Sequence, residues 1–171
     1  GKIEGEAEQG RAKSLAASLG YGFEHAFNED ERRILALLHF FQGFVDVNVL
    51  YIMGNAEYVE TPEYDWRLPQ LQGVANDDLK AMLNRAADIG LLTPLGRDSG
   101  FYTIHPALPW FFKAMFEQYY PEAPLPTSPH RGEELKSDSP PSEGEGPGEG
   151  AARAFVEAMG QLGNHYFWEY E

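Results

Sequence analysis

The stretch NDDLKAMLNRAADIGLLTPLGRDSGFYTIHP, residues 76–106, decides the fold that we expect for this chain. Its first half predicts a helix that is capped by Asn76 and ends at Gly90, with the apolar face Leu79, Met82, Leu83 and Ala86. Its second half contains two short strand candidates, 91–95 and 101–105, which flank a five-residue loop rich in glycine. We therefore expect a helix followed directly by a β-hairpin.

Two more helices are predicted before this stretch. Asn28 and Glu31 have the spacing of a capping box. Apolar residues then recur on one helical face until Gly43 ends the helix: Ile34, Leu37, Leu38 and Phe41. Asp46 is the expected cap of a short helix through Met53, which is joined to the preceding helix by a tight corner. This arrangement is typical of a helix-turn-helix pair.

Three helices followed by a β-hairpin is the element order of a winged-helix domain, which we place at residues 14–120. Residues 14–26 predict a further helical region at its start, and residues 55–75 an irregular connection. Pro106 suits the first turn of a closing helix, whose apolar stripe is Leu108, Phe111, Phe112, Met115 and Tyr119.

The composition changes abruptly after this domain. Pro, Gly and Ser make up more than half of residues 121–150, and acidic residues there outnumber basic ones, which predicts a disordered acidic linker. Residues 151–171 predict a C-terminal helix with Phe155, Met159, Leu162, Tyr166 and Tyr170 in helical register. The expected fold class is mainly α: a winged-helix-like helical domain with a small β-hairpin, then a disordered linker and a C-terminal helix.

Charge and composition indicate which partners and which cellular compartment to expect. The 171 residues include 27 acidic and 13 basic ones, a net charge of −14, which disfavours nucleic acid as a partner. Arg32, Arg33 and Arg97 could contact phosphate, but we expect them to be solvated or paired with acidic neighbours, namely Glu29, Asp30 and Asp98. The chain has no Cys, so we expect a cytoplasmic protein without disulfides. Polar residues interrupt the longest apolar stretch, 34–53, which makes a membrane span unexpected. Because the chain starts with Gly1, its natural start is expected upstream.

The sequence carries no recognisable catalytic motif. It lacks a G-x-x-x-x-G-K-[ST] phosphate loop, so we expect no ATP hydrolysis by the chain alone. It also lacks an H-E-x-x-H zinc motif and a G-x-S-x-G nucleophile elbow. We therefore expect no catalytic residues, no metal site and no enzymatic activity.

Four runs of sequence carry a resemblance to a known family. They are LAASLGYGF at 15–23, NEDERRILALLHFFQGF at 28–44, LNRAADIGLL at 83–92 and YTIHPAL at 102–108. Together they resemble the segment after the nucleotide-binding core in bacterial STAND ATPases of the NB-ARC type, which are multidomain signalling switches. The final helix is similar to the opening of a tetratricopeptide-type array. The chain is therefore expected to be a fragment of a longer ATPase.

The resemblance places His105 on the histidine of the family's Met-His-Asp motif, which contacts the β-phosphate of bound ADP and holds the resting state. Ile104 and Pro106 replace the motif's Met and Asp, so the role of the Asp is lost here. Alternatively, His105 is only a hydrogen-bonded junction residue, and either role requires partial burial.

The family implies a switch module that couples the ADP or ATP state of an upstream nucleotide-binding domain to a C-terminal repeat array, which binds a protein partner. Residues 1–13 would extend from the upstream domain, and residues 151–171 would begin the array. ADP or ATP is expected only in the full-length parent, and no cofactor is expected for this chain alone.

Two other functions stay open. A DNA-binding winged-helix regulator needs a basic recognition helix, but Lys80 and Arg85 are offset in the relevant helix by Asp77, Asp78 and Asp88. A stand-alone protein-interaction domain needs no nucleotide at all. A phosphate loop encoded upstream in the same reading frame would favour the ATPase module over this last function.

Overall fold

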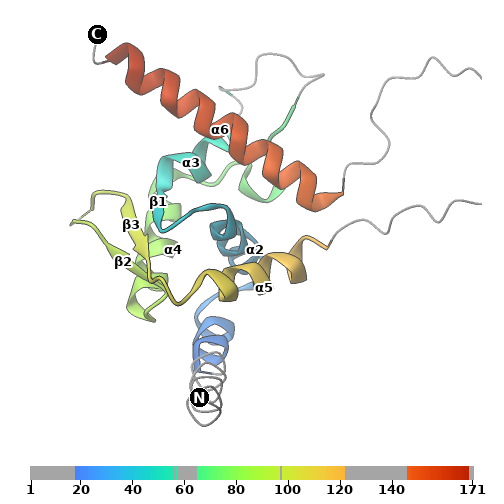
Figure 1. Ribbon diagram of the computed structural model, residues 1–171, viewed down its shortest axis with the longest axis vertical. Helices are drawn as coiled ribbons and strands as arrows, with labels where there is room; N and C mark the ends of the chain where they lie inside the picture. Colours follow the sequence, from blue (N-terminus) through green and yellow to red (C-terminus); the bar gives the residue numbers. More distant parts are fainter. Residues whose placement is uncertain (1–17, 56, 58–64, 97, 122–145, 170–171) are drawn as a thin grey trace, which may run out of the picture.

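The computed structural model describes residues 18–55, 57, 65–96, 98–121 and 146–169 (Figure 1). The chain is mainly helical with a small three-stranded antiparallel sheet, which confirms the expected fold class at this level. The expected N-terminal extension 1–13 and most of the expected linker, residues 122–145, lie outside the described residues. None of the helices within the described ranges is long and apolar enough to cross a membrane.

The helix expected from Asn28 to Gly43 begins where predicted, but its α-helical part ends earlier, at Ala36. Residues 18–26 are helical and are followed by α2 (Glu29–Ala36) and the 3-10 helix η1 (Leu37–Phe40). The capping box is present: the Asn28 side chain accepts a 2.9 Å bond from the Glu31 amide, and the Glu31 carboxylate accepts a 3.0 Å bond from the Asn28 amide. Each side chain thereby satisfies an amide that the first helical turn leaves without a partner.

The short helix α3 (Val47–Ile52) is capped by Asp46, as predicted. The connection that follows contains the 3-10 helix η4 (Pro69–Leu71) and leads to α4 (Asn76–Asp88). The expectation that Asn76 caps α4 is wrong, because the N-cap is Ala75. Asn76 already lies in the helix, and its side-chain amide donates a 3.1 Å bond to the side-chain oxygen of Asn48. The residue therefore ties α4 to α3.

The predicted hairpin is present, and a third strand completes the sheet. Gly90, with φ +85°, ends the α4 region, and β2 (Leu92–Pro94) and β3 (Phe101–Ile104) then pair antiparallel. The corner expected between the two upstream helices contains β1 (Phe44–Asp46), which pairs with β3 and gives the order β1-β3-β2. The hairpin is thereby joined to the helices before it.

The last helix before the expected linker begins later than predicted. It is α5 (Pro109–Tyr119), so Pro109 rather than Pro106 occupies the first turn, and Pro106 is exposed in the turn before it. The predicted stripe does face the core: Leu108, Phe111, Phe112 and Met115 are buried. Tyr119 is partly buried beside them.

The C-terminal helix α6 (Pro147–Glu169) begins four residues earlier than expected, within the range assigned to the linker. It lies across α3 and also contacts η1 (Figure 1). Its small residues Ala151, Ala154 and Ala158 have no exposed surface. The Phe155 ring stacks on Phe40 and meets Phe41 edge-on, with ring centroids 5.4 and 5.1 Å apart. Helix α6 therefore shares one core with the elements before residue 121.

Asp46 is the buried acid of this core, with 6% of its surface exposed. Burial raises the pKa of its carboxyl above the ordinary value, against the opposing effect of its hydrogen bonds with Asn48. The folded chain therefore keeps the Asp46 proton to a higher pH than the unfolded chain does. The contribution of Asp46 to stability must fall as the pH rises through the interval between the unfolded and the folded pKa.

Asp46→Asn keeps an oxygen that can cap α3 but removes the titration. We expect the variant to gain stability relative to the unchanged chain between about pH 4 and about pH 7, because only the unchanged chain must then bury a charge. Urea unfolding at both pH values measures the difference. If the two chains differ in stability by the same amount at both pH values, burial does not raise the pKa of the Asp46 carboxyl.

Candidate functional site

His105 lies in the turn between β3 and α5. The Ala107 amide donates a 3.1 Å hydrogen bond to its Nδ1, and the Leu108 amide donates a 2.9 Å bond to its carbonyl oxygen. These two bonds fix both the ring and the backbone of the residue. The expectation of partial burial is wrong, because His105 is exposed.

The bond to Nδ1 determines what His105 can offer to a ligand. Because Nδ1 accepts a hydrogen from a backbone amide, it is unprotonated, and the proton of the neutral ring lies on Nε2. Nε2 has no hydrogen-bond partner among the residues that the structure describes. The turn therefore presents an N–H donor to solvent, at the position where the resemblance expects a phosphate.

A cleft of about 490 Å³ has Ile104, the residue before His105, in its lining, although His105 itself does not line it. We call it the α5 cleft, since the first turns of α5 form one wall and η1 with residues 41–43 forms the other. Three of its lining side chains are polar or charged: His39, Gln42 and Lys113. The rest of the lining is apolar or glycine: Leu38, Phe41, Gly43, Ile104, Pro109, Trp110 and Phe112. Trp110 is 41% exposed, so its ring is available to a bound group.

Lys113 supplies the positive charge of the α5 cleft. Burial lowers the pKa of the neighbouring His39, and the charge of Lys113 lowers it further, against a smaller effect of Glu117. His39 is therefore neutral near pH 7, and its ring stacks on Phe116 with centroids 5.1 Å apart. Lys113 has only a 3.7 Å ion pair with Glu117, and both side chains are exposed. It can therefore turn toward an anion at little cost.

The basic residues of α4 are engaged within the fold. Lys80 forms a 3.8 Å ion pair with Asp77. Arg85 pairs with Glu31 of α2 and lies over the Phe27 ring, 5.2 Å from its centroid. A recognition helix needs basic side chains that reach outward to phosphates and bases. Helix α4 instead directs its arginine back to α2.

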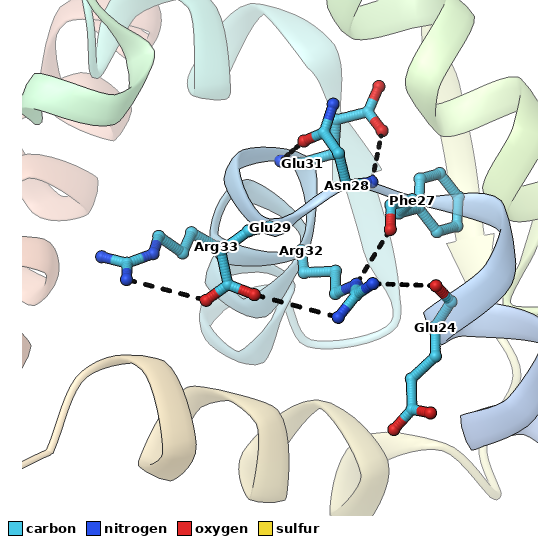
Figure 2. A network of polar contacts seen from close by, with 7 residues as sticks. All are labelled: Glu24, Phe27, Asn28, Glu29, Glu31, Arg32 and Arg33. Atoms are coloured by element: carbon cyan, nitrogen blue, oxygen red, sulfur yellow. Dashed lines mark hydrogen bonds and ion pairs between the residues drawn. The ribbon is translucent and has the colours of Figure 1, made fainter.

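The pairing expected for Arg32 and Arg33 is confirmed (Figure 2). The Glu29 carboxylate lies 3.8 Å from Arg32 and 3.7 Å from Arg33. Arg32 also donates hydrogen bonds of 2.9 and 2.8 Å to the carbonyl oxygens of Phe27 and Glu24. It thereby holds the N-terminal helix against α2. Arg33 lacks such bonds in the figure and points away from Arg32.

The described residues contain no group of three His, Asp or Glu side chains that could hold a metal ion. Comparisons with protein-family models, with curated proteins and with solved structures found no match. The function of this chain must therefore be inferred from its own residues and their geometry.

Proposed function

We propose that this chain is a winged-helix regulatory module of a STAND-type ATPase, which closes over the ADP of an upstream nucleotide-binding domain. The order of its elements supports the winged-helix assignment. Helices α2, α3 and α4 precede the β2–β3 hairpin, and β1, between the first two helices, pairs with the last strand. The hairpin would be the wing of this domain.

The observation that carries the proposal is the exposed His105, whose Nε2 has no hydrogen-bond partner among the described residues. A phosphate oxygen of ADP would accept a hydrogen bond from this nitrogen, whose tautomer the Ala107 amide has already selected. Lys113, which lines the α5 cleft, would add a positive charge. The exposure of His105 leaves its ring accessible to a group on another domain.

A second function, protein binding without nucleotide, is favoured by the outer side of α6. This helix exposes large apolar side chains, including Val156 at 67%, Phe167 at 57% and Trp168 at 74%. Exposed apolar surface of this kind is typical of contacts with other proteins. A DNA-binding role has no comparable support, because the chain has a net charge of −14 and α4 keeps its basic residues paired.

His105→Ala in the full-length gene product is expected to accelerate ADP release about tenfold or more. A hydrogen bond to a charged group contributes roughly 1.5–3 kcal/mol, and each 1.4 kcal/mol corresponds to a factor of ten. The measurement is the dissociation rate of a fluorescent ADP analogue. His105→Gln keeps an N–H donor, so its rate of ADP release should lie between those of the unchanged protein and of His105→Ala.

His25→Ala is the matched control, because it removes another exposed histidine that lies on the N-terminal helix and bonds only to the Tyr21 carbonyl. An unchanged release rate in a folded His105→Ala protein would contradict the nucleotide contact. If the flanking coding sequence lacks a phosphate loop, the ATPase assignment itself fails and the protein-binding function is preferred.

A further inference from the structure

A second cavity, of about 400 Å³, lies where the end of α5, the start of α6, the residues around η4 and α2 meet. It shares no lining residue with the α5 cleft. Its volume falls within the roughly 300–1,000 Å³ of sites that hold small molecules. We call it the arginine pocket, after the charged members of its lining: Arg33, Arg67 and Arg153, together with the aromatic residues Trp66, Tyr119 and Tyr120.

Arginine side chains are concentrated in this pocket, although the chain as a whole is strongly acidic. The described ranges contain five arginines, and three of them line it. Arg67 is neutralised by Asp65, to which it donates bonds of 2.8 and 2.5 Å. Arg33 is likewise paired, with Glu29. The pocket therefore brings together guanidinium groups that an anion could contact in exchange for their present partners.

Arg33 is well placed to bind an anion. Its side chain is half exposed, and its ion pair with Glu29 is long, at 3.7 Å. Exposed ion pairs of this kind contribute little to the stability of the fold. Arg33 can therefore exchange Glu29 for a ligand at a small cost in free energy. Arg153 also lines the pocket and has a further interaction of its own. A guanidinium group can donate two parallel hydrogen bonds to one phosphate or carboxylate.

The floor of the pocket is rigid. The buried Tyr120 hydroxyl donates a 3.0 Å hydrogen bond to the Arg33 carbonyl oxygen and accepts a 2.5 Å bond from the Gln70 side-chain amide. Burial raises the pKa of Tyr120 to about 12, so the hydroxyl stays protonated and keeps donating. Tyr120 thereby fixes the backbone from which Arg33 reaches the pocket. Beside it, the partly exposed rings of Trp66 and Tyr119 offer flat apolar surface.

We propose that the arginine pocket binds a small organic anion: a phosphate or carboxylate group carried on a flat apolar ring. Arg33 and Arg153 contact the anionic group, and the ring lies against Trp66. The aromatic lining and the volume both favour an organic molecule over a bare ion. This site depends neither on His105 nor on a nucleotide-binding domain, so it can be tested on the 171-residue chain itself.

The test is calorimetric titration of the chain with phenyl phosphate, benzoate and inorganic phosphate. We expect saturable binding of one aromatic anion per chain, and the preference between phenyl phosphate and benzoate identifies the anionic group. Inorganic phosphate should bind at least several-fold more weakly than phenyl phosphate, since it lacks the ring. Arg33→Gln should weaken binding of the preferred anion about tenfold, because a charge-assisted contact is lost.

Lys80→Gln removes the same charge from α4, outside the pocket, and should leave the affinity unchanged. Arg153→Gln is the second pocket variant. If Arg33→Gln does not fold, the affinity of Arg153→Gln for the aromatic anion is measured instead. Absence of saturable binding by both aromatic anions would overturn the proposal. Equal losses in the Lys80 and pocket variants would also overturn it, because they would show only an effect of net charge. Equal or tighter binding of inorganic phosphate would refute the contact with the ring.

Discussion

Replacing Ala154 by aspartate is expected to detach α6 from the rest of the chain and to destabilise the whole fold by several kcal/mol. Ala154 has no exposed surface and lies in the middle of the small-residue stripe that faces the core. Burying a carboxylate without a partner costs several kcal/mol, so the helix would release instead. Its release would expose Ala151, Ala158 and the Phe155 ring, which stacks on Phe40.

Val156→Asp is the matched control, since it places the same charge two residues further on the same helix, where the side chain is 67% exposed. Calorimetric melting should show a fall of roughly 10 °C for Ala154→Asp and a change within about 2 °C for Val156→Asp. Equal melting temperatures would mean that α6 does not belong to this core. They would favour the independent repeat array that the resemblance implied.

Local signals in the sequence identified most of the helices. The capping box of Asn28 and Glu31 needs only two side chains in one turn of chain, and a glycine such as Gly90 ends a helix by its own backbone freedom. Strand β1 gave no such signal, because three residues are too few to show a period. It forms only when β3 supplies a partner from the far end of the domain.

The starts of α5 and α6 differ from the predicted ones for different reasons. Pro106 and Pro109 both suit a first helical turn, and the amide bonds to His105 hold the intervening residues in a turn. The start of α6 has the glycine content of a linker. It is helical because the chain packs there against the end of α5, where a side-chain carbon on Gly148 would lie 3.4 Å from the Tyr120 carbonyl oxygen.

His105 and the arginine pocket differ in how far the sequence indicated them. Only the resemblance singled out His105, and its donor geometry follows from a backbone bond that no sequence pattern indicates. The arginine pocket had no sequence signal at all. Arg33, Arg67 and Arg153 lie far apart along the chain: α2 packs against η4, which brings Arg33 and Arg67 together, and the start of α6 packs against the end of α5, which adds Arg153.

Gly54→Ala is expected to destabilise the fold by more than the ~1–3 kcal/mol of ordinary overpacking. A side-chain carbon at this position would lie 2.3 Å from the Leu71 carbonyl oxygen and 2.6 Å from the Leu71 side chain. The backbone itself must move, since no rotamer can relieve a contact with a carbonyl. Yet Leu71 is only 2% exposed, and the Leu68 amide is bonded to the Met53 carbonyl at 2.8 Å.

Gly160→Ala makes the same chemical change in the middle of α6, where the added carbon meets nothing within 4 Å. It should stabilise the chain by about 0.5–1 kcal/mol, because alanine favours the helix. Urea unfolding of both variants tests the opposite signs, and a Gly54→Ala chain as stable as the original would contradict the close approach. The segment that Gly54 holds in place also carries Trp66 and Arg67 into the arginine pocket. Gly54→Ala should therefore weaken binding of the aromatic anion, whereas Gly160→Ala should not.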